Sequence, residues 1–129
     1  LATEFDVVGA GVFGNSAVLP TVGNPYIATG VNPESTTLTK TNTVEPALSV
    51  HSIVSMPYGV LYASQNGLVN VSASGVELIT RELFTKNEWL NEYSPGTLWS
   101  AQYETEYLGF YSDFQGFAVD PADPGVALT

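Results

Sequence analysis

The 129-residue sequence contains no cysteine and only three basic residues. The absence of cysteine excludes disulfide bonds, thiolate metal sites and thiol nucleophiles. Lys40, Arg81 and Lys86 are too few to form the basic surface that neutralises nucleic-acid phosphates, so we expect no tight binding of nucleic acid. No apolar run approaches the length of about 18 residues that a membrane span needs, and no segment resembles a signal peptide.

Charged residues make up only 12% of the chain, against about 25% in a typical soluble protein. Thirteen of them are acidic, which gives a formal net charge of −10. A hydrophobic content of 44% nevertheless predicts one folded domain with a core. The low charge content favours a β protein or a subunit buried in an assembly. Because the chain begins at Leu1 rather than Met, we expect a processed product or a segment of a longer polypeptide.

Three glycines near the start of the chain, Gly9, Gly11 and Gly14, fit the spacing of a dinucleotide-binding turn. That turn requires a helix directly after the third glycine, with its N-terminus at the pyrophosphate. Pro20 would break such a helix after barely two turns, and the residues at 23–25 are typical of a turn. We therefore interpret the glycines as part of a twisted or bulged strand and its turn, and we expect no cofactor.

The same arrangement of an apolar run, a tight turn and a second apolar run occurs three times. Such a pattern is typical of β-hairpins, above all where Asn-Gly forms the turn. The hairpins are expected at residues 16–30, 59–75 and 107–121. Their turns are expected at residues 23–24, 66–67 and 115–116. A further β-like segment precedes each hairpin, at residues 5–13, 51–56 and 98–103.

The turns are spaced about 42 to 49 residues apart, which is the spacing of propeller blades. The sequence therefore predicts an all-β fold of about three antiparallel, propeller-like units, with one short helix near residues 80–92. Propellers close with about four to eight blades, so three units do not close a ring alone. The alternative is a β-sandwich, which is self-sufficient at this length.

We expect a single β-rich domain that spans residues 1–129. Its β units are predicted at residues 5–30, 49–79 and 97–120, with a polar connector at 31–48 that holds an edge strand at 36–41. The helical insert at 80–93 contains Thr85 and Glu88 at the spacing of a capping box. Trp89 in this insert is interpreted as the core anchor of the helix rather than as a ligand platform.

Few residues are candidates for chemistry. His51 is the only histidine, which excludes a histidine-rich metal site, and we expect it to pack or pair rather than to catalyse. Glu104 and Glu106 stand two apart, as on one face of a strand, and paired carboxylates serve glycoside hydrolysis, but we interpret them as solvated charge. Asp120 and Asp123 could bind calcium, although the neighbouring prolines indicate a rigid turn. No catalytic residue is assigned.

Aromatic residues gather late in the chain and are candidates for contacts between proteins. This group comprises Trp99, Tyr103, Tyr107, Phe110 and Tyr111. The interface candidates are Trp99, Tyr103 and Tyr107, with Trp89 as a fourth. Aromatic side chains on strands either fill the space between β units and subunits or stack on sugars. We expect core or subunit contacts, which makes carbohydrate binding the alternative.

The amino-acid sequence of the central stretch resembles virion proteins of tailed bacteriophages. The resemblance rests on residues 52–54, 59–64, 67–69, 83–85 and Trp89. The flanking stretches GVFGNSAVLPTVGNPYIATG and GFAVDPADPG are similar as well, so the resemblance covers most of the chain.

Among these proteins the chain looks most like the β-propeller tail nozzle, or tail tubular component, of short-tailed phages. The resemblance implies a non-catalytic structural protein in the phage tail of the virion, part of a longer chain, whose copies form a ring. Its implied partners are other copies, neighbouring tail proteins and genomic DNA that passes without tight binding. The alternative function is that of a carbohydrate-binding β module in a receptor-binding or glycan-processing protein.

Overall fold

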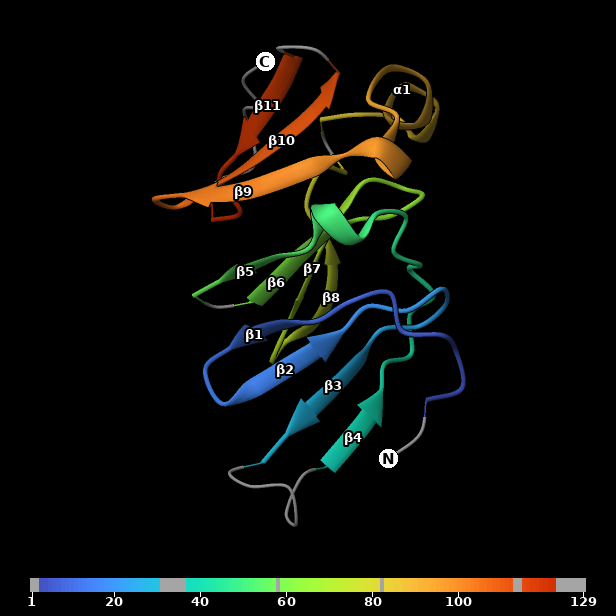
Figure 1. The fold of residues 1–129 in the computed structure, drawn as a ribbon, viewed down its shortest axis with the longest axis vertical. Helices are drawn as coiled ribbons and strands as arrows, with labels where there is room; N and C mark the ends of the chain where they lie inside the picture. Colours follow the sequence, from blue (N-terminus) through green and yellow to red (C-terminus); the bar gives the residue numbers. More distant parts are fainter. Residues whose placement is uncertain (1–2, 31–36, 58, 82, 113–114, 123–129) are drawn as a thin grey trace.

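The computed structural model describes residues 3–30, 37–57, 59–81, 83–112 and 115–122. These residues form three antiparallel sheets and one α-helix (Figure 1). The strands are β1 (Gly11–Phe13), β2 (Ser16–Leu19), β3 (Tyr26–Thr29), β4 (Thr37–Lys40), β5 (Val54–Met56), β6 (Gly59–Ala63), β7 (Leu68–Ser72), β8 (Gly75–Leu78), β9 (Trp99–Tyr103), β10 (Glu106–Ser112) and β11 (Gln115–Val119). The helix is α1 (Lys86–Glu92), and the prediction of an all-β fold with three antiparallel units and a short helix is confirmed.

The first sheet has the order β1-β2-β3-β4 and contains the three glycines of the dinucleotide-type spacing. Gly14 forms the turn between β1 and β2, where its φ of 53° favours glycine. Strand β2 begins at Ser16, so a strand follows the turn where a cofactor site would need a helix. A Cβ added at Gly11 would lie 2.6 Å from the side chain of Val60. Gly11 thus lies in a strand and Gly14 in its turn, as predicted, and Gly11 also makes a close contact with the second sheet.

The second sheet has the order β5-β6-β7-β8, and its central hairpin turns where the sequence predicts. The Ser64 amide donates to the Gly67 carbonyl at 2.8 Å, which closes the turn through Asn66 and Gly67. The φ of Gly67 is 147°, a conformation that side chains other than glycine rarely adopt. The Thr80 hydroxyl fills the space beside Gly67 and accepts a hydrogen bond from the Leu68 amide at 3.1 Å.

The third sheet has the order β11-β10-β9, and here one predicted turn is wrong. Gln115 and Gly116 lie inside β11, so the chain reverses before them rather than at them. Gly116 pairs with Phe110 on β10, and a Cβ at Gly116 would lie 2.6 Å from the Gly109 carbonyl oxygen and 2.9 Å from the Phe110 ring. A side chain at this position would therefore collide with the neighbouring strand. Because glycine is also typical of turns, the sequence alone does not distinguish these two roles.

The helix is shorter than the insert predicted at residues 80–93, because it begins only after Thr85. The Thr85 hydroxyl accepts from the Glu88 amide, and the Glu88 carboxylate accepts from the Thr85 amide, both at 3.1 Å. The predicted capping box is thus confirmed. Leu83 and Phe84 precede the helix in a turn whose amides donate to the Thr80 carbonyl. The helix packs Trp89 inward, as expected for a core anchor.

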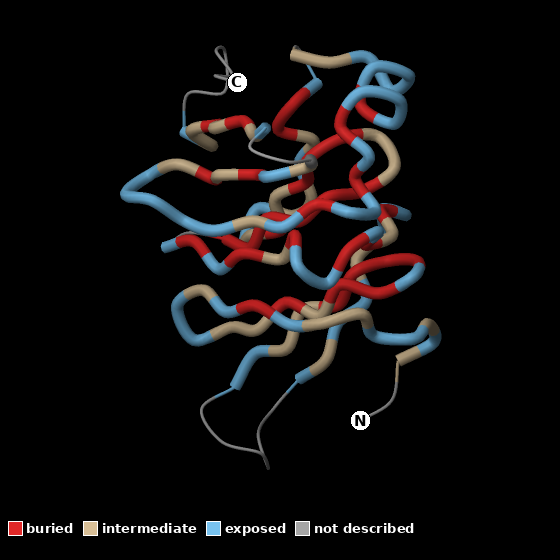
Figure 2. Tube along the Cα trace, turned by 45° about the horizontal axis from the view of Figure 1, so that its top comes forward, coloured by how far each residue is buried: buried red, intermediate tan, exposed pale blue. Residues whose placement is uncertain are grey.

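The three sheets form a stack in which the second sheet lies between the other two (Figure 1). Alternate residues of a strand point to opposite faces of the sheet. Because apolar residues follow one another in β6 and β7, both faces of the second sheet are apolar. One face packs Val60, Tyr62, Val69 and Val71 with Val18 of the first sheet. The other packs Leu61, Ala63 and Leu68 with Tyr107, Phe117 and Val119 of the third sheet, and with Trp89. Buried residues accordingly gather through the middle of the molecule (Figure 2).

Contacts between their first strands, β1, β5 and β9, and hydrogen bonds connect the three sheets. Strand β5 contacts both β1 and β9, so the three lie along the same side of the stack (Figure 1). The Val12 amide donates to the Ser55 hydroxyl at 2.9 Å, which joins the first sheet to the second. The Tyr107 hydroxyl donates to the Ser52 carbonyl at 2.7 Å, and the Ser49 hydroxyl donates to the Leu98 carbonyl at 2.8 Å.

Candidate functional site

The four aromatic interface candidates fall into two groups. Trp89 and Tyr107 are fully buried, with Trp89 donating from Nε1 to the Ser64 carbonyl at 2.6 Å. Both are therefore core residues of this chain, as expected for Trp89 as the anchor of the helix and for Tyr107 as an aromatic residue expected in the core or at a subunit contact. Trp99 and Tyr103 are each 60% exposed on β9. Within the described chain, these two are therefore the candidates that a partner or a sugar can reach.

Trp99 and Tyr103 belong to a larger apolar surface on the third sheet. Tyr107 and Phe117 point to the core, so the alternate residues of these strands point away from it. The register then places Phe110 beside Trp99 and Leu108 between Ala101 and Ala118. Phe110 is itself 50% exposed. We call this surface the outer aromatic face; it comprises Trp99, Ala101, Tyr103, Leu108, Phe110 and Ala118.

His51 contacts the edge of the outer aromatic face. Its imidazole stacks on the Trp99 indole with 3.5 Å between ring centroids and 7° between planes. His51 lies in a short 3-10 helix just before β5, so the stack joins the second sheet to the third. The expectation that His51 packs is confirmed, and the contact limits how Trp99 can move.

The paired carboxylates at 104 and 106 do not share a strand face. Glu104 lies in the turn between β9 and β10 with a φ of 55°, and Glu106 is the first residue of β10. The expectation that they stand on one strand face is therefore wrong, because the chain reverses between them. Glu106 instead pairs with Tyr103 across the sheet. A carboxylate thus lies beside one exposed aromatic residue of the outer aromatic face.

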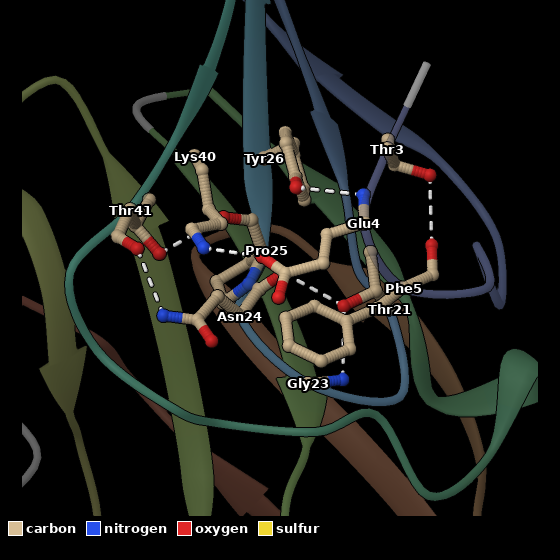
Figure 3. A network of polar contacts seen from close by, with 10 residues as sticks. All are labelled: Thr3, Glu4, Phe5, Thr21, Gly23, Asn24, Pro25, Tyr26, Lys40 and Thr41. Carbon is tan, nitrogen blue, oxygen red and sulfur yellow. Dashed lines mark hydrogen bonds and ion pairs between the residues drawn. The ribbon is translucent and has the colours of Figure 1, made fainter.

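A polar network connects the N-terminal segment to the first sheet (Figure 3). The Glu4 amide donates to the Tyr26 hydroxyl at 2.9 Å, and the Glu4 carboxylate forms an ion pair with Lys40 on the neighbouring strand. Tyr26 pairs with its strand neighbours on the face opposite Ile27, which packs toward the second sheet. The N-terminal segment therefore covers part of the outer surface of the first sheet, and Tyr26 is buried beneath it.

The turn between β2 and β3 belongs to the same network (Figure 3). The buried Thr21 hydroxyl donates to the Asn24 carbonyl at 2.7 Å and accepts from the Gly23 amide at 3.0 Å. The Asn24 amide group donates to the Thr41 carbonyl at 2.9 Å. The polar groups of this turn thus have hydrogen-bond partners within the network. The hydrogen bond from Lys40 to Glu4 raises the pKa of Lys40. The network therefore holds the chain in place rather than presenting reactive groups.

Burial raises the pKa of Tyr62, Tyr93 and Tyr107, and the effect is largest for Tyr62 and Tyr107. Burial raises the pKa of Tyr62 far above its ordinary value, and the nearby Glu45 carboxylate adds to the effect. Burial likewise raises the pKa of Tyr107, against hydrogen bonds to Ser100 and Ser52 that lower it. The Tyr62 hydroxyl donates to the Glu45 carbonyl at 2.6 Å. Both phenols stay protonated in the folded chain and serve as hydrogen-bond donors.

Of the two calcium candidates, the structure describes only Asp120. Asp120 accepts a hydrogen bond from the Ala122 amide at 2.9 Å, which is the rigid turn that the prolines indicate. Asp123 lies outside the described residues. A search of the described part of the chain finds no group of three or more acidic, histidine or cysteine side chains placed to hold a metal ion. The same part of the chain has no helix with the length and hydrophobicity of a membrane span.

Sequence reasoning missed two features of the surface. Phe110 was grouped with the aromatic cluster but not as an exposed residue, and only the register of β9 and β10 reveals its place beside Trp99. Asn70 is not among the interface or metal candidates, and its Oδ1 is buried without a hydrogen-bond partner among the described residues. Its position in a strand between two valines gives no signal in the sequence.

No protein-family model matches this chain, and no curated protein matches it significantly.

Proposed function

We propose that this chain is a non-catalytic structural component of a bacteriophage tail in the virion, acting as a ring subunit of the nozzle or tubular type. The proposal takes up the sequence resemblance to tailed-phage virion proteins. The observation that carries it is the stack of three antiparallel sheets with their first strands side by side. In a β-propeller, successive blades pack in this manner around a central channel.

The exposed aromatic residues support a role in assembly. The outer aromatic face presents Trp99, Tyr103 and Phe110 to solvent on the third sheet at the end of the stack. Protein interfaces are enriched in Trp, Tyr and Phe and depleted of charge at their centres. A neighbouring β unit or tail protein that covers this face would continue the stack by the same sheet-on-sheet packing that the chain already uses twice.

The acidic composition fits a surface that DNA passes. A net charge of −10 repels phosphate and disfavours adhesion of the genome to a conduit. Among the described residues, Glu4, Asp6, Glu77, Glu88, Glu92 and Glu104 are exposed acids. Replacement of those that face a lumen by lysine should slow ejection of the genome, and an unchanged ejection rate would count against this part of the proposal.

The experiment that tests the assembly role is hydroxyl-radical footprinting of the isolated chain and of phage tails that contain it. We expect Trp99, Tyr103 and Phe110 to be oxidised in the isolated chain and protected in the tail. Trp89 is buried in the chain itself and should stay protected in both samples, which makes it the internal control. Equal oxidation of the outer aromatic face in both samples, or absence of the polypeptide from purified tails, would overturn the proposal.

A second candidate function is carbohydrate binding. The specific observation in its favour is that Trp99 and Tyr103 are both exposed, with the Glu106 carboxylate opposite Tyr103. Aromatic rings and carboxylates on an exposed sheet face are suited to stacking on and hydrogen bonding to a sugar. A glycan array probed with the chain, and with Trp99→Ala as the comparison, separates the two functions. Glycan binding that Trp99→Ala abolishes would favour this alternative over the tail subunit.

A further inference from the structure

The outer surface of the first sheet carries a row of apolar residues. Val18 and Ile27 pack toward the second sheet, so the alternate residues of these strands point away from it. The strand register aligns the outward residues in one row across all four strands, and we call this row the outer alanine face; it comprises Val12, Ala17, Ala28 and Leu38. Val12 is 60% exposed, and the other three are half-buried.

The outer alanine face is hollowed, whereas the outer aromatic face carries large side chains. An open hollow of about 340 Å³ lies against Val12, Ala17 and Ala28 and is bounded by residues 14–16 and 29–30. A cavity of about 150 Å³ holds a molecule the size of benzene, so this hollow has room for an aromatic ring. The two faces thus differ in shape in the way that two packed surfaces do.

The two faces lie at opposite ends of the stack (Figure 1). The first and third sheets pack on opposite faces of the second sheet, so their outer surfaces point away from each other. One copy of the chain therefore cannot bring its own two faces together, whereas two copies in the same orientation can. Such a contact joins different surfaces of the two copies.

The exposed aromatic area is enough for a weak contact. A fully covered aromatic side chain buries about 150–250 Å², so residues that are 50–60% exposed, such as Trp99, Tyr103 and Phe110, would bury roughly 75–150 Å² each. Together they supply about a third to a half of the ~800 Å² that each partner buries in a standard interface. Ala101, Leu108 and Ala118 add to this area, and neither face contains a charged residue.

We propose that the outer aromatic face of one copy packs on the outer alanine face of a second copy, in a head-to-tail contact. Trp99 and Phe110, which are neighbours across β9 and β10, place their rings at the hollow beside Ala17 and Ala28. The contact continues the sheet-on-sheet packing that already joins the three sheets within one chain. This inference rests on the proposed role of the outer aromatic face in tail assembly and names the occupant of that face.

The first test is sedimentation velocity of the isolated chain at increasing concentration. A head-to-tail contact repeats from copy to copy, so we expect species larger than a dimer, with a dissociation constant of about 10–100 μM. Because each copy has a net charge of −10, added salt should strengthen the association. A chain that stays monomeric up to about 1 mM would overturn this inference. That result would leave the tail location untouched, since footprinting of purified tails tests it separately.

Variants that block one face each test the pairing of the two faces. Phe110→Glu blocks the outer aromatic face and Val12→Glu blocks the outer alanine face, so each should weaken self-association at least about tenfold. An equimolar mixture should form a dimer that grows no further, because each variant retains the face that the other has lost. Val44→Glu is the matched control: Val44 is also 60% exposed but lies in the connector after β4, and association should stay within about twofold of the original.

Two results with these variants would overturn the proposal. The first is a mixture of the two variants that stays monomeric although circular dichroism shows both to be folded. The second is a Val12→Glu variant that associates as tightly as the original chain while Phe110→Glu does not, because the outer aromatic faces would then pair with each other.

Discussion

His51 and Trp99 stack face to face at the junction of the second and third sheets, 3.5 Å apart between ring centroids and 7° from parallel. The two residues are 48 positions apart in the sequence and belong to different β units. Trp99 is largely exposed, and the His51 imidazole is the side chain on which its indole ring packs. The stack therefore orients one residue of the outer aromatic face.

Replacement of His51 by alanine should lower the free energy of unfolding by about 0.5–1.5 kcal/mol, the range of an aromatic pair. It should also increase the quenching of Trp99 fluorescence by acrylamide. His51→Phe keeps an aromatic ring at this position and is the matched control, with both properties close to the original. Identical unfolding and quenching for the original chain and His51→Ala would show that the stack contributes nothing.

The two tryptophans should respond very differently to the same substitution. Trp89→Phe removes the donor to the buried Ser64 carbonyl and leaves a void in the core, so we expect a loss of about 2–4 kcal/mol in unfolding free energy. Trp99→Phe retains a ring at a mostly exposed position and should stay within about 0.5 kcal/mol of the original. Denaturant unfolding monitored by circular dichroism measures both, and equal losses would contradict the burial of Trp89.

Two glycines with positive φ offer a second matched pair. A Cβ at Gly67 would lie 2.3 Å from the Thr80 hydroxyl in addition to the strain of a φ of 147°. Gly67→Ala should therefore cost about 2–4 kcal/mol. Gly14 has a φ of 53° and open space around it, so Gly14→Ala should cost about 1–2 kcal/mol. Thermal unfolding of both variants tests the order, which the reverse ranking would contradict.

Alkaline pH should destabilise the chain through Tyr62 and Tyr107. Burial raises the pKa of both phenols in the folded state above the ordinary value of about 10. Above that pH the unfolded chain releases protons that the folded chain retains, so stability is intact below about pH 10 and falls as pH rises further.

Absorbance titration measures this directly, because tyrosinate absorbs at longer wavelength than tyrosine. Two of the seven tyrosines should ionise only together with unfolding, and in denaturant all seven should ionise in one step. Tyr62→Phe and Tyr107→Phe should each remove half of the late step. Ionisation of all seven in a single step in the native chain would show that these phenols are open to solvent.

Local signals in the sequence predicted much of the fold. The Asn66-Gly67 turn, the edge strand within residues 36–41 and the Thr85–Glu88 capping box depend on contacts between residues close in sequence, and all three are present. The core position of Trp89 was predicted as well, because an aromatic residue inside a short amphipathic helix needs a surface to pack on.

The errors come from contacts between strands. The sequence predicts a turn at Gly116 because glycine is typical of turns, whereas the Gly109 carbonyl and the Phe110 ring on β10 are what leave no room for a Cβ there. Tyr107 and Tyr103 look alike in sequence, but the pleat of the third sheet directs the first to the core and the second to solvent.

Each sheet is built from strands that follow one another directly along the chain, in the orders β1-β2-β3-β4, β5-β6-β7-β8 and β9-β10-β11. Strand pairing within a sheet therefore closes only short loops, and the distant contacts arise afterwards when whole sheets dock. Folding rates fall as the sequence separation of contacting residues rises, so this chain should form its hairpins faster than a sandwich with crossed strand order. The second sheet, which both neighbours need as a docking surface, is the element on which the final assembly of the fold depends.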